Sequence, residues 1–203
     1  MALPDPLRSN AVLIGFHQRP QELQDLLRVL TEPEHGRLHR DRCTVLTDAP
    51  GPNDIVAVLI RATQDATDTL LVHWAGPALI EDGELYLVLP QTDPERLAAT
   101  AVPYDTVRRI LLRNLRRRRL IVVLDSDLSE HLGLAEIEGA CVVVGAGLTG
   151  AVLIQLTSSD PFAYENLAAV GAETPTAEKE LVLDVRQHGP SVTIDLNAAA
   201  RSV

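Results

Sequence analysis

Aromatic side chains are scarce in this 203-residue chain, in which two Phe, three Tyr and one Trp make up 3% of the residues. So few rings cannot form an extended surface on which nucleic-acid bases stack. Cysteine is rarer still, because Cys43 and Cys141 are the only two. This number excludes a disulfide framework and a four-cysteine zinc site, and it is typical of a reducing cytosol. We therefore expect a cytoplasmic protein.

Basic residues are also in deficit, since 18 Lys plus Arg face 28 Asp plus Glu and leave a formal net charge of −10. Such a balance repels nucleic acid and anionic lipid, so we expect neither a nucleic-acid nor a membrane partner. The first ten residues contain no apolar signal segment. Residues 140–159 are uncharged and long enough to span a membrane, but their glycines favour two buried strands around a turn.

Short apolar runs alternate with stretches in which apolar residues recur every three or four positions. The length and the 46% apolar content predict one domain over residues 1–203. The alternation predicts an α/β fold, with a mostly parallel sheet of about six strands flanked by helices. We expect strands at 11–16, 43–46, 69–74, 84–89 and 120–124, a turn at Asp82 and Gly83, and helices at 21–30, from Asn53 or Asp54 to 68, and at 104–115.

In such a sheet the functional groups lie at the carboxyl ends of the strands. Here those ends are 74–77 and 125–130. The basic run formed by Arg113 and residues 116–119 follows a predicted helix, where cations offset the negative end of the helix dipole. A docking patch for an acidic partner is the alternative interpretation of this run.

Several segments occur in a characteristic order: AVLIG at 11–15, CTVLTD at 43–48, DATD and TLLVHWAG over 65–76, ELYLVL at 84–89, TAVPY at 100–104, LIVVLD at 120–125 and LTSSDPFAYE at 156–165. This order resembles that of the caspase-like cysteine peptidases, in particular their bacterial branch common in actinobacteria, over residues 8–195. The resemblance implies the three-layer caspase-like fold.

In that family a histidine follows the glycine that ends the segment matching TLLVHWAG, and a cysteine stands two residues after the aspartate that ends LIVVLD. The resemblance places Pro77 and Asp127 at these two positions. A proline has no titratable group, and a carboxylate is a far poorer nucleophile than a thiolate. The hypothesis is therefore a catalytically inactive homologue, without cofactor or metal, that acts as a regulatory or adaptor subunit. Its partner would be a second copy or an active peptidase or effector.

Other residues leave enzymatic alternatives open. Ser126 with His131 would make a serine and histidine pair for a hydrolase with non-standard residues. Asp125 and Asp127 resemble the loop of Mg²⁺-dependent phosphatases of the haloacid-dehalogenase type. His73 precedes Pro77 by four residues, about 13 Å along a strand.

Three further patterns have ordinary structural explanations. Gly145, Gly147 and Gly150 match a dinucleotide-binding turn, yet a turn between strands is favoured because no helix is predicted after it. Cys141 begins an apolar run and is interpreted as a buried apolar residue. The spacing of His35, His39 and Cys43 is only weak evidence for a metal site.

Overall fold

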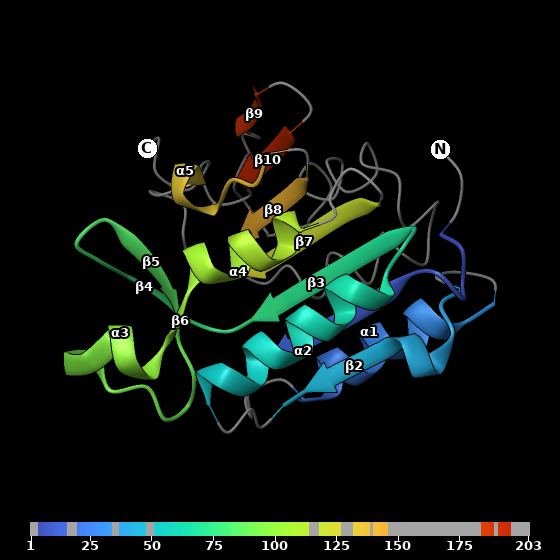
Figure 1. Ribbon diagram of the computed structural model, residues 1–203, viewed down its shortest axis with the longest axis horizontal. Coiled ribbons are helices and arrows are strands. Elements are labelled where there is room, and N and C mark those ends of the chain that lie inside the picture. Colours follow the sequence, from blue (N-terminus) through green and yellow to red (C-terminus); the bar gives the residue numbers. More distant parts are fainter. Residues whose placement is uncertain are drawn as a thin grey trace, which may run out of the picture.

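The computed structural model describes residues 4–15, 20–33, 37–47, 51–113, 118–126, 132–138, 140–145, 184–188 and 191–195. Strands and helices alternate around a central sheet (Figure 1). The strands are β1 (Asn10–Gly15), β2 (Cys43–Leu46), β3 (Thr69–Ala75), β4 (Ala78–Glu81), β5 (Glu84–Leu87), β6 (Val102–Pro103), β7 (Arg119–Asp125), β8 (Cys141–Gly145), β9 (Asp184–His188) and β10 (Ser191–Asp195). The helices are α1 (Pro20–Thr31), α2 (Pro52–Asp65), α3 (Leu97–Thr100), α4 (Tyr104–Leu112) and α5 (Leu132–Ala135), with short 3₁₀ turns η1 (Arg40–Arg42) and η2 (Pro94–Arg96).

The central sheet of the described residues has seven strands in the order β2-β1-β3-β7-β8-β10-β9. All neighbouring pairs are parallel except β10 with β9, which is antiparallel. The predicted α/β fold with a mostly parallel sheet between helices is confirmed, with seven strands where about six were expected. The edge pair β9 and β10 was not predicted.

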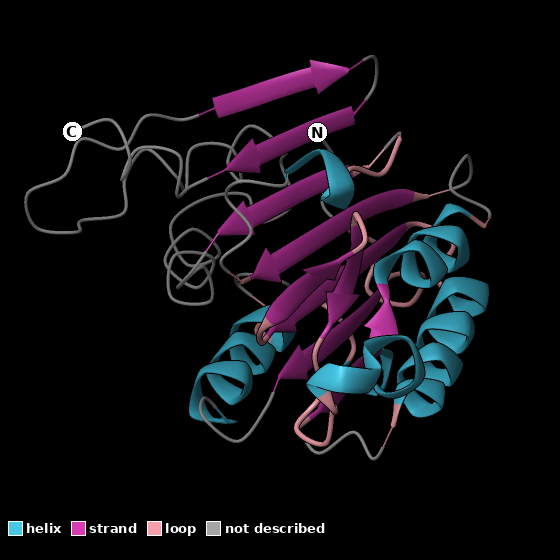
Figure 2. Ribbon diagram, turned by 90° about the vertical axis from the view of Figure 1, so that its left-hand side faces the viewer, coloured by secondary structure: helices cyan, strands magenta, loops and turns pink. Residues whose placement is uncertain are grey.

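The neighbouring strands β1, β3 and β7 are buried and mostly apolar because helices cover both faces of the sheet (Figure 2). On one face, Val12, Val72 and Val122 pack with residues of α2 and α4 in the main core. On the other face, α1 approaches the end of β1 closely. A Cβ built on Gly15 would lie 2.5 Å from a terminal methyl group of Leu23, so only glycine fits there without a shift.

A second sheet of three strands, in the order β4-β5-β6, follows β3 in the chain. In Figure 1 its hairpin lies beyond the arrowhead of β3, at the carboxyl edge of the central sheet. Asp82 and Gly83 join β4 to β5 and both have positive φ, 51° and 79°. Two consecutive left-handed residues make the type I′ turn that suits a tight hairpin. The predicted turn is confirmed.

The helix ends differ from the predictions. Helix α2 begins at Pro52 with Gly51 as its N-cap, so neither Asn53 nor Asp54 caps it. It ends at Asp65, where Ala66 turns to an extended backbone. Asp68, at the expected end of this helix, instead accepts hydrogen bonds on its carboxylate from the backbone N–H of Asp5 and from Ser9, Thr69 and Arg119. This carboxylate joins the N-terminal segment to the starts of β3 and β7.

The basic run has a structural role at Arg118. Its buried guanidinium donates hydrogen bonds to the carbonyl oxygens of Thr63 (2.6 Å), Leu111 (2.9 Å) and Arg113 (2.8 Å). These oxygens lie at the carboxyl ends of α2 and α4, so a cation offsets both helix dipoles. The structural interpretation of the run is confirmed for this residue, while residues 116 and 117 lie outside the described ranges.

Parts of two further predictions also lie outside these ranges, namely the second strand and glycine turn expected within 140–159. In the described residues, the helices are too short or too polar to cross a membrane.

Candidate functional site at the carboxyl edge of the sheet

The described parts of the two stretches expected to carry the site, 74–77 and 125–126, are side by side. Strands β3 and β7 are parallel neighbours whose register pairs Ala75 with Asp125. Beyond that pair, the backbone N–H of Gly76 donates a hydrogen bond to the carbonyl oxygen of Asp125, with an N···O distance of 3.3 Å. Pro77 and Ser126 follow directly, so Pro77 lies near the end of β7. Asp127 and His131 are outside the described residues.

Pro77 is exposed at this edge. Its carbonyl oxygen accepts a hydrogen bond from the N–H of Val88 at 3.0 Å, which fixes the start of the hairpin to its end. The ring carries no group that can accept or donate a proton, so this position offers no acid or base.

Asp125 and Ser126 are both only 6% exposed. Strand β7 ends in a tight turn in which the N–H of Ser126 donates to the carbonyl oxygen of Leu124, at 3.0 Å. The hydroxyl and the carboxylate are therefore enclosed. A buried carboxylate is poorly placed to bind a hydrated Mg²⁺, which keeps several of its waters when bound.

His73 lies one step back from the edge and is fully buried. It pairs in register with Val123, two residues before Asp125, so His73 and Asp125 project from the same face of neighbouring strands. Burial lowers the pKa of His73 to about 4, and the Asp125 carboxylate acts in the opposite direction. The imidazole is thus neutral at pH 7 and enclosed, whereas a general base must reach its substrate.

Neither cysteine is placed for nucleophilic catalysis. Cys141 is the first residue of β8 and pairs with Ile121 in the amino-terminal half of β7, away from the carboxyl edge. Burial raises the pKa of this thiol to about 12. Cys43 is also buried, and its burial raises the pKa to about 11 although the nearby Arg40 lowers it. Thiols with such pKa values remain protonated at pH 7 and are unreactive, which agrees with the interpretation of Cys141 as a buried apolar residue.

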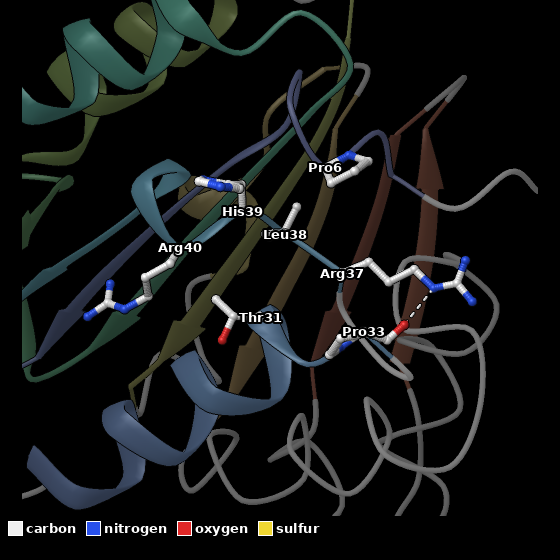
Figure 3. A pocket seen from close by; sticks show the side chains of 7 residues that line it. All are labelled: Pro6, Thr31, Pro33, Arg37, Leu38, His39 and Arg40. Carbon is white, nitrogen blue, oxygen red and sulfur yellow. Dashed lines mark hydrogen bonds between the residues drawn. The ribbon is translucent and has the colours of Figure 1, made fainter.

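A cavity of about 760 Å³ lies at the opposite end of the sheet, near the starts of β1 and β2 (Figure 3). It has a basic rim, but Arg37 and Arg40 extend to opposite sides of it in Figure 3. The Nε of Arg37 donates to the carbonyl oxygen of Pro33 at 2.9 Å. The guanidinium groups of Arg37 and Arg40 therefore do not converge on a common point in the cavity where an anion would bind.

The weak metal-site pattern receives little support. His35 is outside the described ranges, and the Nδ1 of His39 accepts a hydrogen bond from the N–H of Asp41 at 3.4 Å. The thiol of Cys43 contacts the backbone oxygen of His39. Within the part of the chain that the structure describes, no three His, Cys, Asp or Glu side chains form a group able to hold a metal ion.

Sequence reasoning located the carboxyl edge correctly but missed the proximity of His73 to Asp125. The signal was present in the two runs TLLVHWA and RLIVVLD, which have equal length. Aligning their carboxyl ends as parallel neighbours puts the side chains of His73 and Asp125 on one face.

Comparisons with protein-family models and with curated proteins find no match to this chain.

Proposed function

We propose that this chain is a catalytically inactive homologue of the caspase-like cysteine peptidases and that it binds other proteins as a regulatory or adaptor subunit. The order of elements supports the family assignment. A buried strand at 69–75 is followed by a hairpin, a short strand at 102–103, a helix that begins at Tyr104 and the neighbouring strand of the sheet. The segments that resemble the family occupy these elements in the same order.

One observation carries the proposal of inactivity. The two chain segments at which an imidazole and a thiol would meet are hydrogen-bonded neighbours, through Gly76 and Asp125, and the position of the imidazole is Pro77. The sequence has Asp127 at the position of the thiol. A negative charge there would oppose the oxyanion that forms when a peptide carbonyl is attacked.

The imidazole next to this edge, that of His73, and both cysteine thiols are enclosed. The imidazole of His73 and the thiol of Cys141 are buried, and burial favours the neutral form of each. Peptide hydrolysis by a thiol requires a thiolate and a base within hydrogen-bond reach. The framework of a peptidase site is therefore retained without its reacting groups, and binding is the function left to it.

The test is turnover by the purified 203-residue chain on a mixture of quenched fluorescent peptides. We expect no cleavage above that of the Ser126→Ala and Asp127→Ala variants. Cleavage by the wild-type chain that disappears in either variant would show an active hydrolase. A parallel assay with p-nitrophenyl phosphate and Mg²⁺ examines the phosphatase alternative, for which release must depend on both Mg²⁺ and Asp127.

A further inference from the structure

Strand β4 has one unpaired edge. It is the outer strand of the β4-β5-β6 sheet, and no described residue pairs with its other side. In an antiparallel hairpin, hydrogen-bonded pairs alternate with non-hydrogen-bonded ones. The bond from Val88 to Pro77 and the pairing of Leu79 with Tyr86 set this alternation. Consequently, the backbone N–H and C=O groups of Ala78 and Ile80 point away from β5, and these four groups are available to another strand.

The side chains along this edge combine an apolar contact with negative charge. Leu79 is 41% exposed, and Glu81, Asp82 and Glu84 are exposed at the hairpin tip. The raised pKa of Tyr86 agrees with a negative electrostatic potential at this tip. It is raised first by the hydrogen bond that the phenol donates to Glu84, and further by burial and by the surrounding carboxylates.

We propose that the free edge of β4 binds an extended, basic segment of a partner protein by strand addition. This inference rests on the proposed binding function and names the surface and the chemistry of the partner. The outward backbone groups of Ala78 and Ile80 supply the hydrogen bonds. Leu79 lies on the same face of β4 as Glu81, so it contacts the apolar stem of a Lys or Arg side chain whose charged end pairs with the tip carboxylates. In strand addition, main-chain bonds give affinity and alternate side chains give specificity.

A second copy of this chain fits the same edge less well. Each copy carries a formal net charge of −10 and an acidic hairpin tip, so pairing two copies through β4 brings like charges together. A basic segment has the complementary charge. When it is added to β4, it lies near Pro77, which directly precedes this strand at the carboxyl edge of the central sheet.

The experiment measures binding of labelled peptides to the 203-residue chain by fluorescence anisotropy. The main probe is a short peptide of alternating lysine and valine. The first control alternates glutamate and valine. The second alternates lysine and proline, which keeps the charge but lacks alternate N–H groups. We expect the lysine and valine probe to bind at least about tenfold more tightly than either control. Equal binding of the two lysine peptides would overturn strand addition and indicate charge attraction alone.

Variants of the chain locate the site. Ala78→Pro removes one outward N–H and leaves the bonds to β5, so we expect binding about tenfold weaker. Glu81→Lys combined with Glu84→Lys reverses the preference toward the glutamate and valine peptide. Asp65→Lys makes the same kind of charge change at the far end of α2 and leaves binding unchanged. Unchanged binding in the double lysine variant overturns the proposal even where Ala78→Pro does not fold.

The outcome also separates this inference from the function on which it rests. Absence of probe binding, together with absence of peptide cleavage, refutes the strand-addition site and leaves the inactive homologue in place. Probe binding together with cleavage that depends on Ser126 or Asp127 refutes the inactive homologue and leaves the binding edge in place.

Discussion

The buried imidazole of His73 makes the stability of this fold depend on pH in a defined range. In the folded chain its pKa is lowered from 6.5 to about 4 by burial. As the pH falls below 6.5, the unfolded chain binds a proton at this residue while the folded chain does not. The unfolded state is therefore favoured increasingly down to pH 4, where the folded state is protonated too. The contribution of His73 to the free energy of unfolding is fully present above pH 6.5 and is lost as the pH falls toward 4.

The magnitude follows from the same two values. Each pKa unit is worth about 1.4 kcal/mol, so a decrease from 6.5 to about 4 corresponds to about 3 kcal/mol of unfolding free energy lost across this range. The steepest slope is about 1.4 kcal/mol per pH unit, because a single proton is involved. Carboxylates with lowered pKa, such as Asp68 and Asp105, destabilise the fold only below about pH 4.

The assay is urea unfolding followed by circular dichroism at a series of pH values from 4 to 7, for the wild-type chain and for His73→Leu. Leucine fills a similar volume and cannot be protonated. We expect the slope between pH 4 and 6.5 to be smaller in the variant by about one proton. Asp125→Asn removes the nearby carboxylate that raises the pKa of His73, so the loss of stability in that variant extends to lower pH. Equal slopes for the wild-type chain and His73→Leu would refute a buried neutral imidazole.

Three further substitutions test the packing and polar contacts. Gly15→Ala places a methyl group against Leu23 and lowers the unfolding free energy by about 1–3 kcal/mol, measured by urea unfolding. Arg118→Met keeps much of the volume but loses three hydrogen bonds to carbonyl oxygens, so a loss of about 2–4 kcal/mol is expected, only partly recovered in Arg118→Lys. Asp68→Asn weakens the junction with Arg119, and the midpoint of thermal unfolding falls at pH 7 but converges with that of the wild-type chain below pH 4, since the pKa of Asp68 is lowered. A midpoint difference that persists unchanged in acid would contradict this role of the charge.

Much of the fold was predictable because β1, β3 and β7 are buried on both faces and therefore appear as mostly apolar runs. The helix ends were less accessible, since α2 is capped by Gly51 without any side-chain bond. Strands β9 and β10 contain the polar sequences DVRQH and SVTID, which carry no apolar run. Strand β10 is placed by its pairing with β8, which is distant in sequence.

The candidate site was predictable only in part, for a similar reason. The rule that parallel strands present their carboxyl ends at one edge brought Pro77 to the end of β7. The burial of Asp125 and Ser126, and the position of His73 beside them, depend on strand register and on what covers each face. A single sequence does not contain that information in local form.

The reactivity of a thiol introduced at Asp127 tests the central claim most directly. The Asp127→Cys variant is compared with the Asp127→Cys, Pro77→His double variant, and the rate of alkylation by iodoacetamide is measured against pH. If these two positions are those of a lost nucleophile and its histidine, the imidazole lowers the thiol pKa. Alkylation near pH 6.5 is then at least about tenfold faster in the double variant. Identical pH profiles for the two variants would contradict the claim that these positions once formed one catalytic pair.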